Sequence, residues 1–263
     1  MKQLLVTKRT WLALPIAVAI AALLHAQATD TYKPVVGQAG KDVVWVPTPQ
    51  ELVDTMLDMA KVTPQDLVMD LGSGDGRTVI TAAKRGATAI GVEYNPEMVQ
   101  LSKSNAINER VTDKATFVQA DLFTVDLSKA SVITMFLLPT INLKLRPILL
   151  DLKPGTRIVS NTFDMAEWEP DERKVIGPEG CTSWCTALLW IVPAKVQGNW
   201  KTAQGNLRIT QSFQKITGTL GTTPITGKLA GDQISFMAAS ASYTGRVTGN
   251  TIQASNWTAS RIE

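Results

Sequence analysis

The fold of this 263-residue chain is decided by one short stretch, Val68-Met69-Asp70-Leu71-Gly72-Ser73-Gly74-Asp75-Gly76-Arg77. An apolar run ends there in three closely spaced glycines. Glycine tolerates positive φ and lets the backbone approach a ligand closely. A glycine loop between a strand and a helix is typical of a nucleotide site at the carboxyl end of a parallel strand. The stretch therefore predicts a strand at residues 67–71, a helix at 77–85 and a ligand between them.

Strand-like and helix-like segments alternate on both sides of this loop. A helix is predicted to begin at Thr48-Pro49-Gln50-Glu51, which reads as a capping box with proline at the first helical position. Further strands are predicted at residues 88–93, 115–121, 131–137 and 156–163, helices at 96–108 and 141–152, and two last strands near 173–176 and 186–192. This alternation predicts an α/β fold, a Rossmann-like, doubly wound and mainly parallel seven-stranded sheet.

The sequence changes character near residue 197, where we place a domain boundary. Residues 198–263 are rich in Gly, Thr, Ser and Gln and contain an internal repeat. Residues 227–234 and 245–252 both read Gly-[Lys/Arg]-[Leu/Val]-x-Gly-[Asp/Asn]-x-Ile. Short strands joined by such turns predict a small antiparallel β domain, either a sheet or a partial barrel. Most of its larger aromatic residues are expected to form its core, namely Trp200, Phe213, Phe236, Tyr243 and Trp257.

Residues 1–28 read as a secretory signal peptide rather than as part of the fold. A basic start is followed by the 14-residue apolar stretch 11–24 and by Ala26-Gln27-Ala28, an A-x-A cleavage signal. The apolar stretch is short for a membrane span, which needs about 20 residues. An uncleaved signal anchor is the alternative, and residues 11–28 would then be the only membrane contact. Either interpretation places the body of the protein outside the cytoplasm, in the periplasm or secreted.

Removing that segment changes the charge balance and removes the only histidine, His25. Residues 1–28 hold three basic side chains and no acidic one, so the 26 basic residues fall to 23 and equal the 23 acidic ones. A neutral body gives no indication of a nucleic-acid partner. Without histidine, a Ser-His-Asp triad, a Cys-His dyad and a His-ligated metal site are excluded, and no metal is expected. Cys181 and Cys185 form either a disulfide or two small buried apolar side chains.

Acidic residues end the two strands that follow the glycine loop. Glu93 closes the strand at 88–93, where a carboxylate suits the two hydroxyl donors of a ribose. Asp121 closes the strand at 115–121, where it can accept a hydrogen bond from an exocyclic amine. Together with the loop, these carboxylates describe a nucleoside pocket.

The spacing of the loop distinguishes between nucleoside cofactors. The dinucleotide fingerprint is G-x-G-x-x-G, whereas here the third glycine, Gly76, comes one residue early. The loop also contains Asp70 and Asp75, which would repel a pyrophosphate. Two acids suit the cationic methionine end of S-adenosylmethionine (SAM) instead.

Three motifs resemble those of class I SAM-dependent methyltransferases. V-M-D-L-G-S-G-D-G-R resembles motif I, G-V-E-Y-N-P-E-M-V the next motif and Q-A-D-L-F the third, within roughly residues 43–193. More narrowly, the D-L-G-S-G-D-G-R loop, the V-P-T-P helix start and F-L-L-P resemble small lysine methyltransferases of the ATP-synthase c-subunit type. Exported bacterial methyltransferase-like proteins with a similar C-terminal tail are also similar. The resemblance implies that SAM is bound by Asp70, Gly72, Ser73, Gly74, Asp75, Gly76, Glu93, Asp121 and Leu122.

The acceptor side departs from one known pattern. No Asn-Pro-Pro-Tyr type motif follows the strand at 131–137, where the chain instead reads Met-Phe-Leu-Leu-Pro. The absence of that motif disfavours methylation of DNA adenine and of glutamine. Phe136 and a turn at Pro139 are expected to line a narrow acceptor channel, the alternative being simple strand-end packing. Further candidates to face the acceptor are Thr48, Asn161 and Asp164, each of a kind that is more often a strand-end or cap residue than a catalytic one.

Three functions follow from these observations. The first is methyl transfer from SAM to an acceptor, either a protein, at lysine, or a small molecule. The second is an NAD-dependent oxidoreductase, which the early third glycine and the loop acids disfavour. The third is an exported, non-catalytic protein of methyltransferase-like fold, favoured because SAM is made in the cytoplasm and disfavoured because the pocket residues are all in place.

Overall fold

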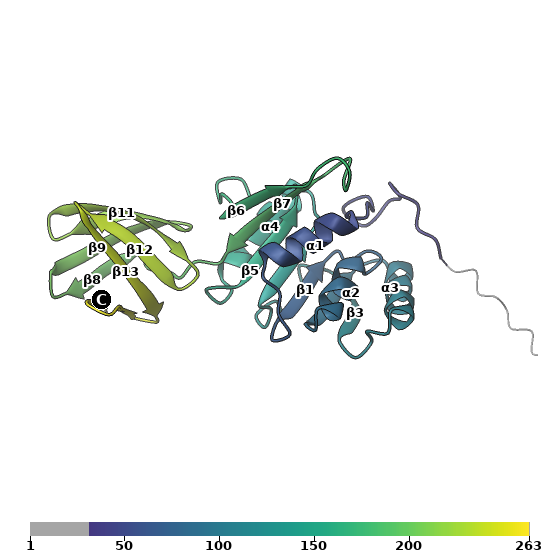
Figure 1. Ribbon diagram of the computed structural model, residues 1–263, viewed down its shortest axis with the longest axis horizontal. Helices are drawn as coiled ribbons and strands as arrows, with labels where there is room; N and C mark the ends of the chain where they lie inside the picture. The colour runs from purple at the N-terminus through teal and green to yellow at the C-terminus, as the bar shows by residue number, and fades with distance from the viewer. Residues whose placement is uncertain (1–31, 263) are drawn as a thin grey trace, which may run out of the picture. The chain divides into compact units, whose positions relative to one another are not determined.

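The computed structural model describes residues 32–262 (Figure 1). The predicted signal peptide, residues 1–28, lies outside the described residues. Within the described part of the chain, no helix is long and apolar enough to cross a membrane.

A seven-stranded sheet forms the centre of the first domain, with the strand order β3-β2-β1-β4-β5-β7-β6. Strands β1 to β5 run parallel, and β7 is antiparallel to both β5 and β6. The strands are β1 Leu67–Leu71, β2 Thr88–Glu93, β3 Ala115–Gln119, β4 Val132–Met135, β5 Arg157–Asn161, β6 Glu172–Val175 and β7 Thr186–Ile191. The helices are α1 Gln50–Met59, α2 Arg77–Lys84, α3 Pro96–Asn108 and α4 Pro139–Leu150. The predicted doubly wound, mainly parallel sheet is therefore confirmed.

Alternate residues of the central strands supply two apolar cores, one on each face of the sheet. Val68 of β1 packs in the core that contains α1, α2 and α3, whereas Met69 packs in the core that contains α4. This alternation follows from the two-residue period of a strand. The strand order reverses between β1 and β4, because the chain builds β2 and β3 on one side of β1 and β4 and β5 on the other. Ligands of such sheets bind at this reversal, beyond the carboxyl ends of the strands.

Three local predictions need correction. Thr48 does not cap α1: the N-cap position is Pro49, and no side chain caps the helix. Pro139 is not a turn, since α4 begins with this proline, whose fixed φ suits the first helical position. Strand β3 ends at Gln119, so Asp121 lies two residues beyond the strand.

The C-terminal strands close completely into an eight-stranded antiparallel barrel, rather than a sheet or a partial barrel. Each strand pairs with the next along the chain, and the last, β15, pairs with the first, β8. Closure leaves no free sheet edge, which a short sheet of this kind would otherwise expose. The strands are β8 Gly198–Thr202, β9 Gly205–Ser212, β10 Lys215–Leu220, β11 Thr223–Ala230, β12 Gln233–Ala238, β13 Ala241–Thr248, β14 Thr251–Gln253 and β15 Thr258–Ile262.

The internal repeat corresponds to two hairpins of this barrel, β11–β12 and β13–β14. The second glycine of each repeat, Gly231 or Gly249, takes the turn with φ of 61° or 56°. The first glycine lies inside the barrel: a Cβ on Gly227 would come within 2.5 Å of Cβ of Phe236. The repeat thus encodes a turn and a space for an aromatic ring.

Four of the five aromatic residues expected in this core pack there. Trp200, Phe236 and Trp257 are buried, and Tyr243 packs against them half-buried. The exception is Phe213, which stacks on Trp168 with ring centroids 6.1 Å apart and belongs to the core containing α4.

Candidate functional site

A cavity of about 520 Å³ opens at the carboxyl ends of the strands, around the reversal between β1 and β4. Most of the residues implied to bind SAM line it, namely Asp70, Gly72, Ser73, Gly74, Asp75, Glu93, Asp121 and Leu122. Gly76 is absent from the lining. Of the acceptor candidates, Thr48 and Phe136 line the cavity, whereas Pro139, Asn161 and Asp164 do not. The structure thus brings together residues separated by more than 70 positions in the sequence.

The three loop glycines are each required by their backbone conformation. Their φ angles are 76°, 54° and 83° for Gly72, Gly74 and Gly76, in the region that side-chain-bearing residues avoid. A Cβ on Gly74 would lie 2.7 Å from Nε1 of Trp45, and one on Gly76 would lie 2.7 Å from the ring of Phe117. The third glycine therefore serves packing behind the cavity rather than contact with a ligand.

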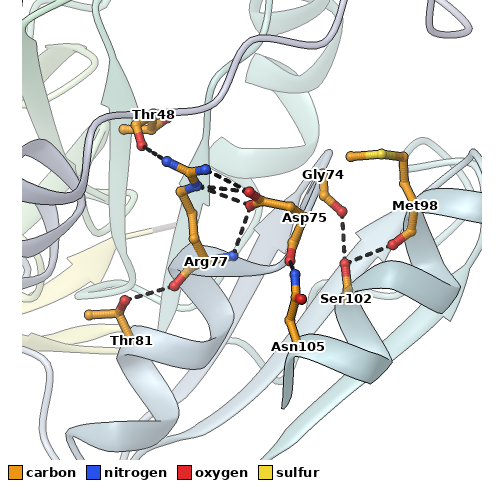
Figure 2. Close-up of polar contacts among 8 residues, drawn as sticks. All are labelled: Thr48, Gly74, Asp75, Arg77, Thr81, Met98, Ser102 and Asn105. Carbon is orange, nitrogen blue, oxygen red and sulfur yellow. Dashed lines mark hydrogen bonds and ion pairs between the residues drawn. The ribbon is translucent and has the colours of Figure 1, made fainter. Parts of the chain in front are cut away.

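Helix α3 holds the loop through two side-chain hydrogen bonds (Figure 2). The Ser102 hydroxyl donates a 2.7 Å hydrogen bond to the carbonyl of Gly74, and the Asn105 amide donates one of 2.9 Å to the carbonyl of Asp75. The loop conformation is thus fixed by hydrogen bonds before any ligand binds.

Arg77 neutralises one of the two loop acids. Its guanidinium donates to both carboxylate oxygens of Asp75, at 2.6 Å for Nη2 to Oδ2 and 3.0 Å for Nε to Oδ1, and also to the carbonyl of Thr48 at 2.9 Å (Figure 2). Of the two loop acids expected to suit a cationic ligand, Asp75 is therefore already paired with Arg77. The pair instead ties the segment before α1 to the glycine loop.

The other loop acid, Asp70, forms no ion pair with any basic side chain of the described residues. It is buried at the end of β1, and the Thr134 hydroxyl of β4 donates a 2.6 Å hydrogen bond to its Oδ1. Burial, with smaller contributions from the charges of Asp75 and Glu93, raises the pKa of the Asp70 carboxyl to about 7. A cationic ligand beside it would favour the ionised form.

Backbone amides orient the carboxylate of Glu93. Oε2 accepts from the amide of Gly74 at 3.0 Å, and Oε1 accepts from the amide of Asn95 at 2.9 Å. Asn95 in turn caps α3, with its side chain accepting from the amide of Glu97. A fixed carboxylate on the cavity wall has remaining lone pairs for a ribose diol.

The segment ahead of α1, residues 37–45, forms a hairpin on the cavity. The amide of Trp45 donates to the carbonyl of Gln38, the carbonyl of Trp45 accepts from the amide of Gly37, and Ala39 pairs with Val44. Residues 38–48 all line the cavity. The hairpin was missed because it contains only weak strand signals and depends on tertiary contacts.

Lys41 of this hairpin engages Asp121. Its Nζ lies 2.5 Å from Oδ2 of Asp121 and 4.8 Å from the ring centroid of Tyr94. The hydrogen bond from Lys41 lowers the pKa of Asp121 below its usual range. Asp121 is therefore paired in this structure rather than free for an adenine amine. Tyr94 was missed by sequence reasoning, although its position directly after Glu93 at a strand end was a usable signal.

The acceptor candidates that miss the cavity have structural roles. Asn161 is buried and donates from Nδ2 to the hydroxyl of Thr48 at 3.3 Å. Asp164 is exposed and accepts from the amide of Ala166 at 3.1 Å in a turn. Two aromatic residues that sequence reasoning did not select, Phe163 and Trp184, line the cavity beside Phe136. Trp184 lies within the loop closed by a disulfide between Cys181 and Cys185, which settles the alternative left open by the sequence.

Comparisons with known proteins agree with this geometry. The family described as the ANTKMT methyltransferase domain matches residues 70–172. A protein-lysine N-methyltransferase of Saccharolobus islandicus is 47% identical over 153 residues, which are 57% of this chain and 94% of that protein. The human lysine N-methyltransferase of the ATP synthase c-subunit is 37% identical over 128 residues, 48% of this chain and 54% of that protein.

One solved structure is similar over the same region. The RNA methyltransferase of Salinibacter ruber, in complex with S-adenosyl-L-homocysteine, is 45% identical and superposes with a TM-score of 0.53. The match covers 57% of this chain and 96% of that one. The C-terminal barrel lies beyond the region that the family match covers.

Proposed function

The chain belongs to the family of protein-lysine N-methyltransferases, SAM-dependent enzymes of class I, and on this premise we propose that it methylates the ε-amino group of a lysine in a protein. The relative from S. islandicus, nearly all of which is covered by this chain, carries that activity in its name. The relative from S. ruber holds S-adenosyl-L-homocysteine, the product of SAM after methyl transfer. These matches favour a methyltransferase over both an NAD-dependent oxidoreductase and a non-catalytic binding protein.

The half of the cavity over β1 and β2 suits SAM. Asp70 and Glu93 place two carboxylates there, which suit a cofactor that carries positive charge. SAM supplies a methyl group already activated by its sulfonium charge. The remaining task of the chain is to orient the acceptor and exclude water, which is catalysis by positioning.

The other half of the cavity, over β4, β5 and β7, carries the proposal. The lining residues that end or follow β4 and β5, together with those from α1, α4 and the Cys181–Cys185 loop, are uncharged: Met56, Met135, Phe136, Leu138, Ile141, Phe163 and Trp184. Arg77, which reaches the carbonyl of Thr48 nearby, is paired with Asp75. A lysine amine attacks only in its neutral form, and an apolar pocket favours that form by desolvation. The methylene stem of lysine also packs well on apolar walls. The two halves thus separate a site for a cationic cofactor from a site for a neutral amine.

A protein acceptor fits the charge balance better than RNA does. One solved relative is named an RNA methyltransferase. Nucleic-acid binding depends on neutralising phosphates with clustered basic residues, and this chain without residues 1–28 has 23 basic and 23 acidic residues.

The test is incubation of residues 29–263 with tritiated SAM and a fractionated cell extract. We expect label in macromolecular material that protease releases and ribonuclease leaves intact, with no label when Glu93→Gln replaces the wild type. Label that ribonuclease releases, or label confined to small molecules, would contradict the proposal.

We further propose that the protein acts outside the cytoplasm. The basic start, apolar stretch and A-x-A signal of residues 1–28 support export. The Cys181–Cys185 disulfide also supports it, because such bonds persist mainly in oxidising compartments. N-terminal sequencing of the chain recovered from the periplasm or medium should begin at residue 29. A full-length chain found only in the cytosol would refute export.

A further inference from the structure

Three aromatic rings form one wall of the cavity, each from a different part of the sheet. Phe136 follows β4, Phe163 follows β5 and Trp184 precedes β7. The ring centroids of Phe136 and Phe163 are 5.9 Å apart, and those of Phe136 and Trp184 are 6.1 Å apart. We call these three residues the aromatic wall. It lies on the half of the cavity away from Glu93 and Asp121, which are carried by β2 and the segment after β3.

Trp184 is unusual within this wall. Its exposure is 44%, whereas Trp168, Trp190 and Trp200 are fully buried. Tryptophan is enriched at interfaces, where a large apolar ring meets a partner. The exposed ring faces a cavity rather than an isolated patch of surface.

The backbone of Trp184 is held in a conformation that tryptophan avoids. Its φ is 55°, in the left-handed region. Such strain persists only where the surroundings enforce it, and it is concentrated at functional sites. Here the Cys181–Cys185 disulfide closes the loop around Trp184, and Cys181 is buried in the core that contains α1. The disulfide is thus an anchor that holds an exposed ring in place.

We propose that the aromatic wall is the subsite for the acceptor side chain and that Trp184 determines its specificity, by packing on the methylene stem of lysine and holding its methylated ammonium against the ring. This inference rests on the proposed lysine methylation and adds the residue that selects the acceptor. In this scheme the Cys181–Cys185 disulfide positions Trp184 and touches neither cofactor nor acceptor.

The chemistry of the wall explains why aromatic rings suit this role. No carboxylate lies among the described lining residues that end or follow β4 and β5 or that come from α1, α4 and the Cys181–Cys185 loop. A carboxylate would hold the amine in its protonated form, which cannot attack. A tryptophan face attracts an ammonium within about 6 Å of its centroid less strongly than a carboxylate does, so it opposes the loss of the proton less. Methylated ammonium groups are the cations for which aromatic faces are best suited, so a monomethylated or dimethylated lysine would be retained for another transfer.

The test compares three synthetic heptapeptides that differ only at the central residue, which is lysine, Nε-dimethyllysine or norleucine. Binding is measured by calorimetry with S-adenosyl-L-homocysteine present. We expect the dimethyllysine peptide to bind about tenfold more tightly than the norleucine peptide. Trp184→Ala should abolish this preference, and Trp184→Phe should keep most of it. The Kd for S-adenosyl-L-homocysteine should stay within about twofold in both variants, which shows that the cofactor half remains folded.

A second comparison tests the anchoring role of the disulfide. The Cys181→Ser/Cys185→Ser double variant should lose the dimethyllysine preference as Trp184→Ala does, with unchanged cofactor affinity. Turnover of the lysine peptide should shift from trimethylated toward monomethylated product in Trp184→Ala.

Several results would overturn the proposal. A dimethyllysine preference that survives Trp184→Ala, or its absence in the wild type, would refute the assignment of the wall. Tight binding of a mixed-sequence RNA oligonucleotide that is lost in Trp184→Ala would reassign the wall to base stacking. A wild-type protein that prefers dimethyllysine yet transfers no methyl group to lysine would instead refute the proposed function alone.

Discussion

Lowering the pH from 8 to 6 is expected to weaken SAM binding about tenfold, through protonation of Asp70. The pKa of this carboxyl is raised to about 7 by burial, so it is mostly protonated at pH 6 and mostly ionised at pH 8. SAM is cationic and should bind the ionised form. If only that form binds, about 90% of the sites at pH 6 must lose a proton first, whereas about 10% must do so at pH 8, which gives the tenfold difference.

Calorimetry in two buffers of different ionisation enthalpy measures the proton directly. At pH 6 SAM binding should release about 0.9 protons, and at pH 8 about 0.1, because the bound cofactor keeps Asp70 ionised. Asp70→Asn should bind SAM weakly, with no pH dependence between 6 and 8. A wild-type affinity that is flat across this range, or binding without proton release at pH 6, would refute the role assigned to Asp70.

The same carboxyl has an opposite effect on the stability of the ligand-free protein. Its pKa is higher in the folded state than the usual 3.8, so ionising it costs stability. This cost is absent below pH 4, grows as the pH rises toward 7, and is complete above 7, where a shift of this size corresponds to about 4 kcal/mol. Asp70→Asn should therefore raise the free energy of unfolding at pH 8 and leave it nearly unchanged at pH 4, as urea denaturation would show.

Three further predictions concern the surroundings of the cofactor. Lys41→Ala and Asp121→Asn should each speed SAM dissociation about threefold in stopped-flow fluorescence, because both remove the same partly exposed ion pair between the hairpin and the cavity. This acceleration should disappear at 1 M salt, which screens the pair. An effect of only one variant would exclude the ion pair as the cause. Gly74→Ala should reduce SAM affinity more than tenfold, since the new methyl group meets Trp45 in a left-handed backbone; unchanged affinity would show that the loop adapts. Deletion of residues 198–263 should leave the Kd for SAM within about twofold of its value in the full-length protein, because the barrel has its own core and contributes nothing to the cavity lining. A tenfold loss of SAM affinity in a folded truncation would contradict this separation.

The features that could be predicted from sequence are those encoded locally. The strand before Gly72, the helix after Gly76 and the helix at 96–108 depend on backbone preferences of neighbouring residues, so their positions were predicted within a few residues. The mainly parallel character of the sheet followed from the alternation of strands and helices. Glu93 was located correctly at the cavity because a strand end fixes where its side chain lies.

The features that were missed depend on contacts between distant segments. Asp75 looked free until Arg77 and the segment at Thr48 were brought together, and Asp121 looked free until the hairpin placed Lys41 beside it. The closure of the barrel depends on pairing between its first and last strands, which no local pattern encodes. Trp184 lines the cavity from a loop closed by a disulfide that the sequence had left as one of two alternatives.

The central claim is methyl transfer from SAM to a lysine side chain, and amino-acid analysis of the labelled product tests it most directly. Protein labelled by residues 29–263 with tritiated SAM should yield Nε-methylated lysine after acid hydrolysis, and none when Glu93→Gln is used. Label recovered in any other amino acid, in a nucleoside, or in no product at saturating SAM would contradict the account.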